Sequence, residues 1–83
     1  MEDAMKLRVL KAVNSKEQIN IIKLKGSLIS KGYTEIIHID DHDEEFHINS
    51  FMVSQKNRSE VHNFIKDFLS KAELDHTVTI LKE

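Results

Sequence analysis

TEIIHIDDHDEEFHINSFMVS, the stretch from Thr34 to Ser54, decides the fold, because two apolar alternations in it flank an acidic tip. Alternation with a period of two is typical of a strand that buries one face. The stretch therefore predicts a β-hairpin. We expect its core face to hold four residues: Ile37, Ile39, Phe46 and Ile48.

This core face fixes the expected pairing of the two strands. With a tip from Asp41 to Glu44, Ile39 lies opposite Phe46 on the core face. The same register puts His38 opposite His47 on the other face. A slip of one residue would exchange the faces, so the surroundings of every side chain in the hairpin depend on this register.

A strand and a helix precede the hairpin. Lys6 to Val13 reads as a strand, with Leu7 and Val9 on the face that we expect to be buried. Ser15 to Lys31 reads as a helix whose first residue begins a capping box. Gly32 suits the left-handed position that ends many helices, so we expect the helix to stop there.

A second helix and a last strand follow the hairpin. Asn57 to Ala72 predicts a helix with Asn57 as its N-cap. His76 to Lys82 predicts a strand with Val78 and Ile80 facing inward. The apolar residues of the helix form a stripe of roughly 140°. The stripe consists of Val61, Phe64, Ile65, Phe68, Leu69 and Ala72.

The predicted order of elements is βαββαβ. Right-handed crossovers put both helices on one face of a four-stranded antiparallel sheet. This is the ferredoxin-like arrangement of the α+β class. We expect one domain over residues 1–83, because the chain is short, lacks Pro and contains only two Gly.

Composition excludes several classes of function. The chain has no Cys, so disulfides and thiolate metal sites are excluded. The net charge of -2 provides no bulk positive field for a phosphate backbone. No apolar run approaches the ~20 residues of a membrane span, and the start of the chain lacks the apolar segment of a signal peptide. We expect a cytoplasmic protein without a cofactor.

The hairpin tip is rich in ionisable side chains, with three His and five carboxylates in residues 38–47. Imidazole and carboxylate groups are ligands for zinc and similar ions. One hypothesis is therefore a metal site. Its expected ligands are His38, Asp40, Glu45 and His47. The alternative is a solvated acidic turn that resists pairing between sheet edges.

Catalysis and nucleic-acid binding receive less support. The chain has no phosphate loop or nucleophile elbow, so we expect no enzyme. Sheets of the RNA-recognition type stack bases on exposed aromatic residues, and Phe51 is the one that we expect on the open face. Nucleic-acid binding through this face stays the main alternative function. The candidate acids and bases are Glu35, His38, His47 and His62.

Two apolar surfaces favour protein binding instead. The first is the open face of the sheet, where clustered apolar side chains are unusual for an idle surface. The second is the first helix, whose apolar residues cover roughly 220°, wider than one buried face requires. The expected partner-binding residues are Leu10, Ile36, Phe51, Val53 and Leu81 on the sheet, and Ile21, Leu24 and Leu28 on the helix.

Residues 57–68 read N-x-S-x-V-x-x-F-I-x-x-F. This pattern resembles a helix of a small phage-encoded Cas9 inhibitor of the anti-CRISPR class. The resemblance implies a protein from a mobile element that occludes an enzyme, and it carries over no functional residue. We hypothesise a non-catalytic regulator or inhibitor that docks on another protein or forms a homodimer.

Overall fold

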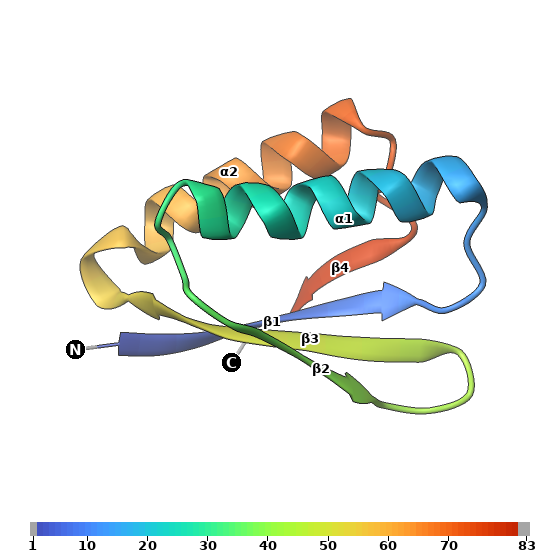
Figure 1. Ribbon diagram of the computed structural model, residues 1–83, viewed down its shortest axis with the longest axis horizontal. Helices are drawn as coiled ribbons and strands as arrows, with labels where there is room; N and C mark the ends of the chain where they lie inside the picture. The colour runs from blue at the N-terminus through green and yellow to red at the C-terminus, as the bar shows by residue number, and fades with distance from the viewer. Residues whose placement is uncertain (1, 82–83) are drawn as a thin grey trace.

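The computed structural model describes residues 2–81 and confirms the ferredoxin-like α+β fold (Figure 1). Four antiparallel strands form one sheet in the order β2-β3-β1-β4, and both helices cover the same face of it. The elements are β1 (Glu2–Leu10), α1 (Ser15–Ser30), β2 (Ile37–Asp41), β3 (Phe46–Ser54), the 3-10 turn η1 (Gln55–Asn57), α2 (Arg58–Lys71) and β4 (Val78–Leu81).

The strand β1 begins at Glu2, earlier than the predicted start at Lys6, because it pairs with β3 along the whole length of both strands. The other predicted elements occur, with ends that differ by a few residues at most. Lys82, which ends the predicted last strand, lies outside the described residues.

The core lies between the sheet and the two helices. Leu7 and Val9 of β1 face it as predicted, and Val78 of β4 is 2% exposed. The predicted stripe of α2 is confirmed, because its members are either buried or packed against the buried cluster. Burial of such side chains supplies most of the stability of a small domain.

The predicted register of the hairpin is wrong. Ile37 lies opposite Phe51, and Ile39 lies opposite Asn49. Directly opposed residues share one face of the sheet. Since Phe51 and Asn49 are each 2% exposed, this face is the one under the helices.

The corrected register exchanges the two faces of β3. Phe46 and Ile48 lie on the open face, and Phe51 and Val53 lie in the core, where Val53 is 1% exposed. Both alternations of β3 contain large apolar residues, so periodicity alone could not choose between them. The choice follows from β1, because Met5 lies opposite Phe51 and is itself 2% exposed.

The turn of the hairpin has a specific polar cause. One side-chain oxygen of Asp43 accepts hydrogen bonds from the backbone N–H groups of Glu45 (2.8 Å) and Phe46 (2.9 Å). These two bonds hold the pKa of the Asp43 carboxyl below its ordinary value. An aspartate that bonds to the backbone two residues on fixes a turn without glycine, and here it moves the tip one residue past the predicted position.

The first helix is capped by Asn14 rather than by Ser15. The Asn14 side chain accepts a hydrogen bond from the Glu17 N–H (2.8 Å), and the Glu17 carboxylate accepts one from the Asn14 N–H (3.0 Å). At the other end, Gly32 has a φ of 78° and confirms the predicted stop. The Tyr33 N–H then bonds to the Leu28 carbonyl, which completes a Schellman motif.

The second helix ends in the same motif without a glycine. Glu73 takes the left-handed position with a φ of 59°, and the Leu74 N–H bonds to the Leu69 carbonyl at 2.8 Å. Leu74 is fully buried and leads into β4. At the start of this helix, Asn57 occupies the predicted N-cap position, but its side chain makes no capping hydrogen bond to the described residues.

Within residues 2–81, none of the helices has the length and apolar character needed to cross a membrane.

Candidate docking surface

The wide apolar arc of α1 is divided between the core and the surface. Ile21, Leu24 and Leu28 are at most 7% exposed and pack in the core. The prediction that these three residues bind a partner is therefore wrong in its placement, because their side chains are already covered within the chain. They share one narrow face of the helix, as spacings of three and four residues require.

The remainder of the arc points to solvent. Ile19, Ile22 and Ile29 are 54%, 59% and 46% exposed. Gly26 lies on the same flank of the helix, and an added Cβ would meet nothing within 4 Å there. The sequence signal for this surface was the width of the arc, but the sequence could not say which part of the arc the sheet covers.

The neighbouring edge strand β2 adds two more exposed isoleucines. Ile36, directly before the strand, is 62% exposed and lines a hollow with His38 and Met52 of the open face, where it was predicted, whereas Ile39 is 55% exposed. Ile39 points to the same side of the sheet as the helices, because it lies opposite the buried Asn49. The helices therefore do not cover the half of β2 that lies next to the hairpin turn.

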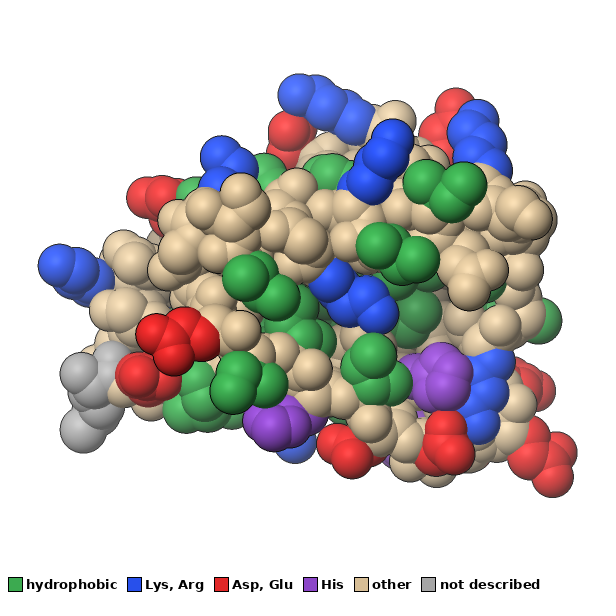
Figure 2. Space-filling model, viewed as in Figure 1, with side chains coloured by type: hydrophobic (Ala, Val, Ile, Leu, Met, Phe, Trp, Pro, Cys, Tyr) green, Lys and Arg blue, Asp and Glu red, His purple; other side chains and the backbone are tan. Residues whose placement is uncertain are grey.

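The exposed isoleucines of α1 and Ile39 of β2 lie on the helix side of the sheet, and we call them the isoleucine surface. Figure 2 shows hydrophobic side chains spread over the side where α1 and β2 lie, with a cationic side chain between them. Among the described residues, six large hydrophobic side chains are exposed, and four of them belong to this surface. Scattered exposed apolar residues are ordinary, whereas a group on one side marks an interaction site. The isoleucine surface consists of Ile19, Ile22, Ile29 and Ile39.

The same side carries an unpaired strand edge. Asn49 and the other odd-numbered residues of β3 bond to β1, since the Lys11 N–H bonds to the Glu45 carbonyl in that ladder. In the β2–β3 ladder the His42 N–H bonds to the Phe46 carbonyl, so even-numbered residues of β2 bond to β3. Backbone groups alternate along an antiparallel strand. The N–H and C=O groups of residues 37, 39 and 41 therefore point outward from the sheet.

The open face of the sheet differs from the prediction. Phe51 and Val53 do not lie on it, because they are buried under the helices. Leu10 and Leu81 do lie on it and are partly buried. The sixth exposed hydrophobic residue, Met52, belongs to this face and is 47% exposed.

The aromatic residue that the described chain presents on the open face is Phe46. The guanidinium carbon of Arg8 stands 4.7 Å from the centre of its ring. A ring stacked by a guanidinium group is occupied by a cation–π contact and does not offer that side to a base. This arrangement favours nucleic-acid binding less than the predicted exposed ring would.

The four predicted metal ligands do not come together. His38 and Asp40 point to the open face, while His47 lies on the helix side with Asp41. Residues 2–81 contain no cluster of three or more His, Asp or Glu side chains suited to hold a metal ion. The reason is the register, which puts His38 opposite Ser50 instead of His47.

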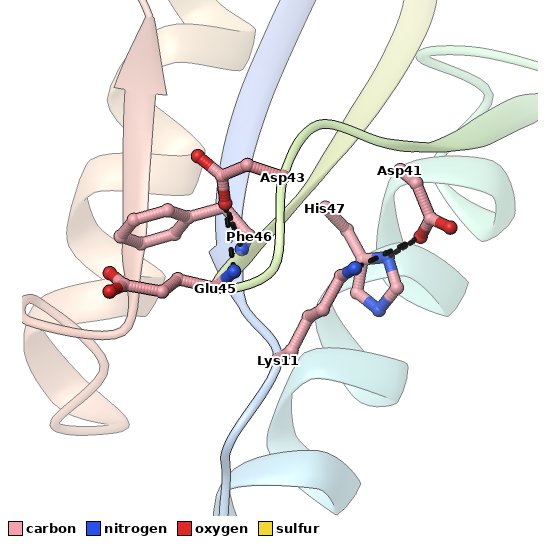
Figure 3. A network of polar contacts seen from close by, with 6 residues as sticks. All are labelled: Lys11, Asp41, Asp43, Glu45, Phe46 and His47. Atoms are coloured by element: carbon pink, nitrogen blue, oxygen red, sulfur yellow. Dashed lines mark hydrogen bonds and ion pairs between the residues drawn. The ribbon is translucent and has the colours of Figure 1, made fainter.

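Instead, the hairpin carries a small polar network (Figure 3). The Asp41 carboxylate lies 3.3 Å from the Lys11 Nζ atom and 3.2 Å from the His47 Nδ1 atom. Asp43 points the other way and binds the backbone of Glu45 and Phe46, as described above. Lys11 thus supplies a positive charge where the metal hypothesis needed a cation, and the network ties the end of β1 to the hairpin.

Two hollows in the surface could receive small groups. A hollow of about 490 Å³ is lined by side chains of both helices, among them Lys16, Phe64 and Phe68. A second hollow of about 420 Å³ is lined by Glu35, His38 and other residues around the start of β2. Glu35 and His38 are two of the four candidate acids and bases, but His47 lies on the other face and His62 is exposed on α2.

Comparisons with known proteins add no functional information: no protein-family model matches the chain, and no curated protein sequence matches it significantly.

Proposed function

We propose that this chain is a small cytoplasmic protein-binding module that regulates a partner by docking on it, without catalysis. The observation that carries the proposal is the gathering of four exposed isoleucines on the side formed by α1 and β2. Each such side chain left in water forgoes about 1.5–3 kcal/mol of burial free energy. A partner that covers this surface recovers part of that free energy.

The strand edge next to the isoleucines supports the same proposal. Outward N–H and C=O groups of β2 can bond to an added strand, while the isoleucines give that strand an apolar neighbour. Proteins usually shield such edges with a proline, a bulge or a cover, because open edges pair with other chains. Residues 37–41 contain no Pro, and β2 pairs with β3 without a bulge, so the shielding of this edge is limited to the charges of Asp40 and Asp41.

Site-specific photocrosslinking in cells tests this proposal. A photoreactive amino acid in place of Ile39 samples the isoleucine surface, and the same replacement at Thr79 samples the other edge strand. We expect protein adducts from position 39 and none above background from position 79. Adducts of any defined mass from position 39 support docking, whereas equal background from both positions contradicts it.

A further inference from the structure

We propose that the partner on the isoleucine surface is a second copy of this chain, joined through antiparallel pairing of the two β2 strands. This inference rests on the proposed docking function and names its partner. The pairing would join two four-stranded sheets into one continuous sheet around a two-fold axis. A two-fold contact uses the same patch on both copies, so the patch must be complementary to itself.

The backbone restricts the possible registers. Only residues 37, 39 and 41 present their N–H and C=O groups at the free edge, so hydrogen-bonded pairs across the axis must join these residues. With the axis at Ile39, Ile39 pairs with its own copy and Ile37 pairs with the partner's Asp41. This register forms about six backbone hydrogen bonds, two for each hydrogen-bonded pair.

The charges select this register over its neighbours. With the axis at Ile39, each His38 stands opposite the Asp40 of the other copy, in the pair type where side chains approach most closely. Moving the axis to position 38 opposes two histidines, and moving it to position 40 opposes two aspartates. Opposed aspartates are destabilising, and opposed histidines leave each carboxylate without an imidazole partner, so only the central register sets each imidazole against a carboxylate.

The exposed side chains agree with the same axis. His38 and Asp40 point to the open face and are exposed, so both are available for contacts across the axis. Ile39 points to the helix side, where the two copies of this residue would meet across the axis. The exposed Ile22 and Ile29 belong to α1, which covers the same face of the sheet as the one to which Ile39 points. A second copy of the chain thus offers its own apolar Ile39 at the position where the isoleucine surface needs an apolar contact.

Sedimentation of complementary charge variants tests the proposal. We expect the wild type to sediment as a dimer. His38→Asp sets two aspartates against each other across the axis, and the double variant His38→Lys with Asp40→Lys sets lysines against each other. Each should weaken dimerisation by about tenfold or more, since each variant creates two pairs of like charges across the axis.

The mixture of the two variants is the decisive sample. Each acidic position then faces a lysine of the other chain, so we expect a one-to-one heterodimer. Thr79→Asp, on the other edge strand, is the matched control and should sediment like the wild type. A monomeric wild type, a His38→Asp variant that dimerises normally or a mixture that stays monomeric each overturns the proposal.

The outcome is separable from the docking function. If the wild type is monomeric while position 39 crosslinks to a different polypeptide, self-pairing is wrong and docking stands. If position 39 forms no adduct at all, both are wrong.

Discussion

The two edge strands of the sheet, β4 and β2, differ in how far the core covers their helix-side residues. At β4 the helix-side residue Val78 is 2% exposed, and the preceding Leu74 is fully buried. At β2 the helix-side residue Ile39 is 55% exposed, although Ile37 on the same side packs against the core. The core therefore covers the helix side of β4 at Val78, whereas on β2 it covers Ile37 and leaves Ile39 exposed.

The polar side chains of β3 explain why the core does not extend over the half of β2 that lies next to the hairpin turn. On the helix side this strand reads Val53, Phe51, Asn49 and His47 toward the hairpin. Asn49 is buried, and its side-chain oxygen has no hydrogen-bond partner among residues 2–81. A buried polar group without a partner costs free energy. An apolar core extended over Ile39 would also lie over Asn49, so it would gain little free energy. The core therefore ends where the helix-side residues of β3 change from apolar to polar, and the helix side of β2 beyond that position stays exposed.

The largest expected effect concerns the inner end of β2. Phe51→Glu should unfold the protein, because it puts a carboxylate without a counter-charge into the core beside Ile37. Met52→Glu is the matched control on the open face and should change the free energy of unfolding by less than about 0.5 kcal/mol. Circular dichroism with urea titration measures both. A folded Phe51→Glu variant would mean that the faces of β3 are assigned wrongly.

The next effect compares the two edges directly. Leu74→Ala, beside β4, should lower the free energy of unfolding by about 2–5 kcal/mol, as truncation of a buried leucine does. Ile36→Ala, beside β2, should change it by less than about 0.5 kcal/mol in dilute solution, where self-association contributes nothing. Urea unfolding measures the difference. Equal losses from the two truncations would remove the distinction between the edges.

A smaller effect lies at the turn that leads into β4. Glu73→Gly should raise the free energy of unfolding by about 1 kcal/mol, because the left-handed conformation is strained for residues with a Cβ. Gly32 already occupies the equivalent position after α1. Thermal unfolding measures the gain, with Glu73→Ala as the control that should not produce it. A loss of stability with glycine would show that Glu73 is held by contacts instead of being strained.

The smallest expected effect is an acid dependence at the β4 edge. The Thr77 hydroxyl donates to the Glu17 carboxylate at 2.7 Å, and this bond, with the one from the Asn14 N–H, lowers the pKa of Glu17 below 4.5. A lowered pKa in the folded state means that the stabilisation is complete above pH 4.5 and is lost as the pH falls below it.

Glu17→Gln should therefore flatten the loss of stability in acid, while Glu44→Gln at the exposed hairpin tip should leave it as in the wild type. Urea midpoints measured at several pH values below neutrality decide this. The same slope in the Glu17→Gln variant would show that other carboxylates carry the acid dependence, with Asp43 the first to examine because its pKa is lowered as well.

The fold could be predicted from the sequence because its signals are local. Gly32 ends α1, the apolar stripe marks α2, and alternation marks Val78 and Ile80. These features depend on periods and caps within one segment, and such patterns survive in any context.

The candidate site could be predicted only in part, because it depends on contacts between segments. The width of the apolar arc predicted an apolar surface on α1. Which isoleucines of the arc the sheet covers depends on packing between segments. The hairpin register depends on Asp43, whose side chain bonds to the backbone and shifts the turn. Since β3 is apolar on both faces, nothing within the strand revealed that error, and Phe51 and Val53 were placed on the wrong face.

Amide hydrogen exchange as a function of protein concentration tests the central claim most directly. The N–H of Ile39 points out of the edge of β2, and by the same alternation the N–H of Ile80 points out of the edge of β4. If β2 pairs with a second copy, protection of the Ile39 amide should rise with concentration, while the Ile80 amide should exchange rapidly throughout. Rapid exchange of both amides at every concentration would contradict the account.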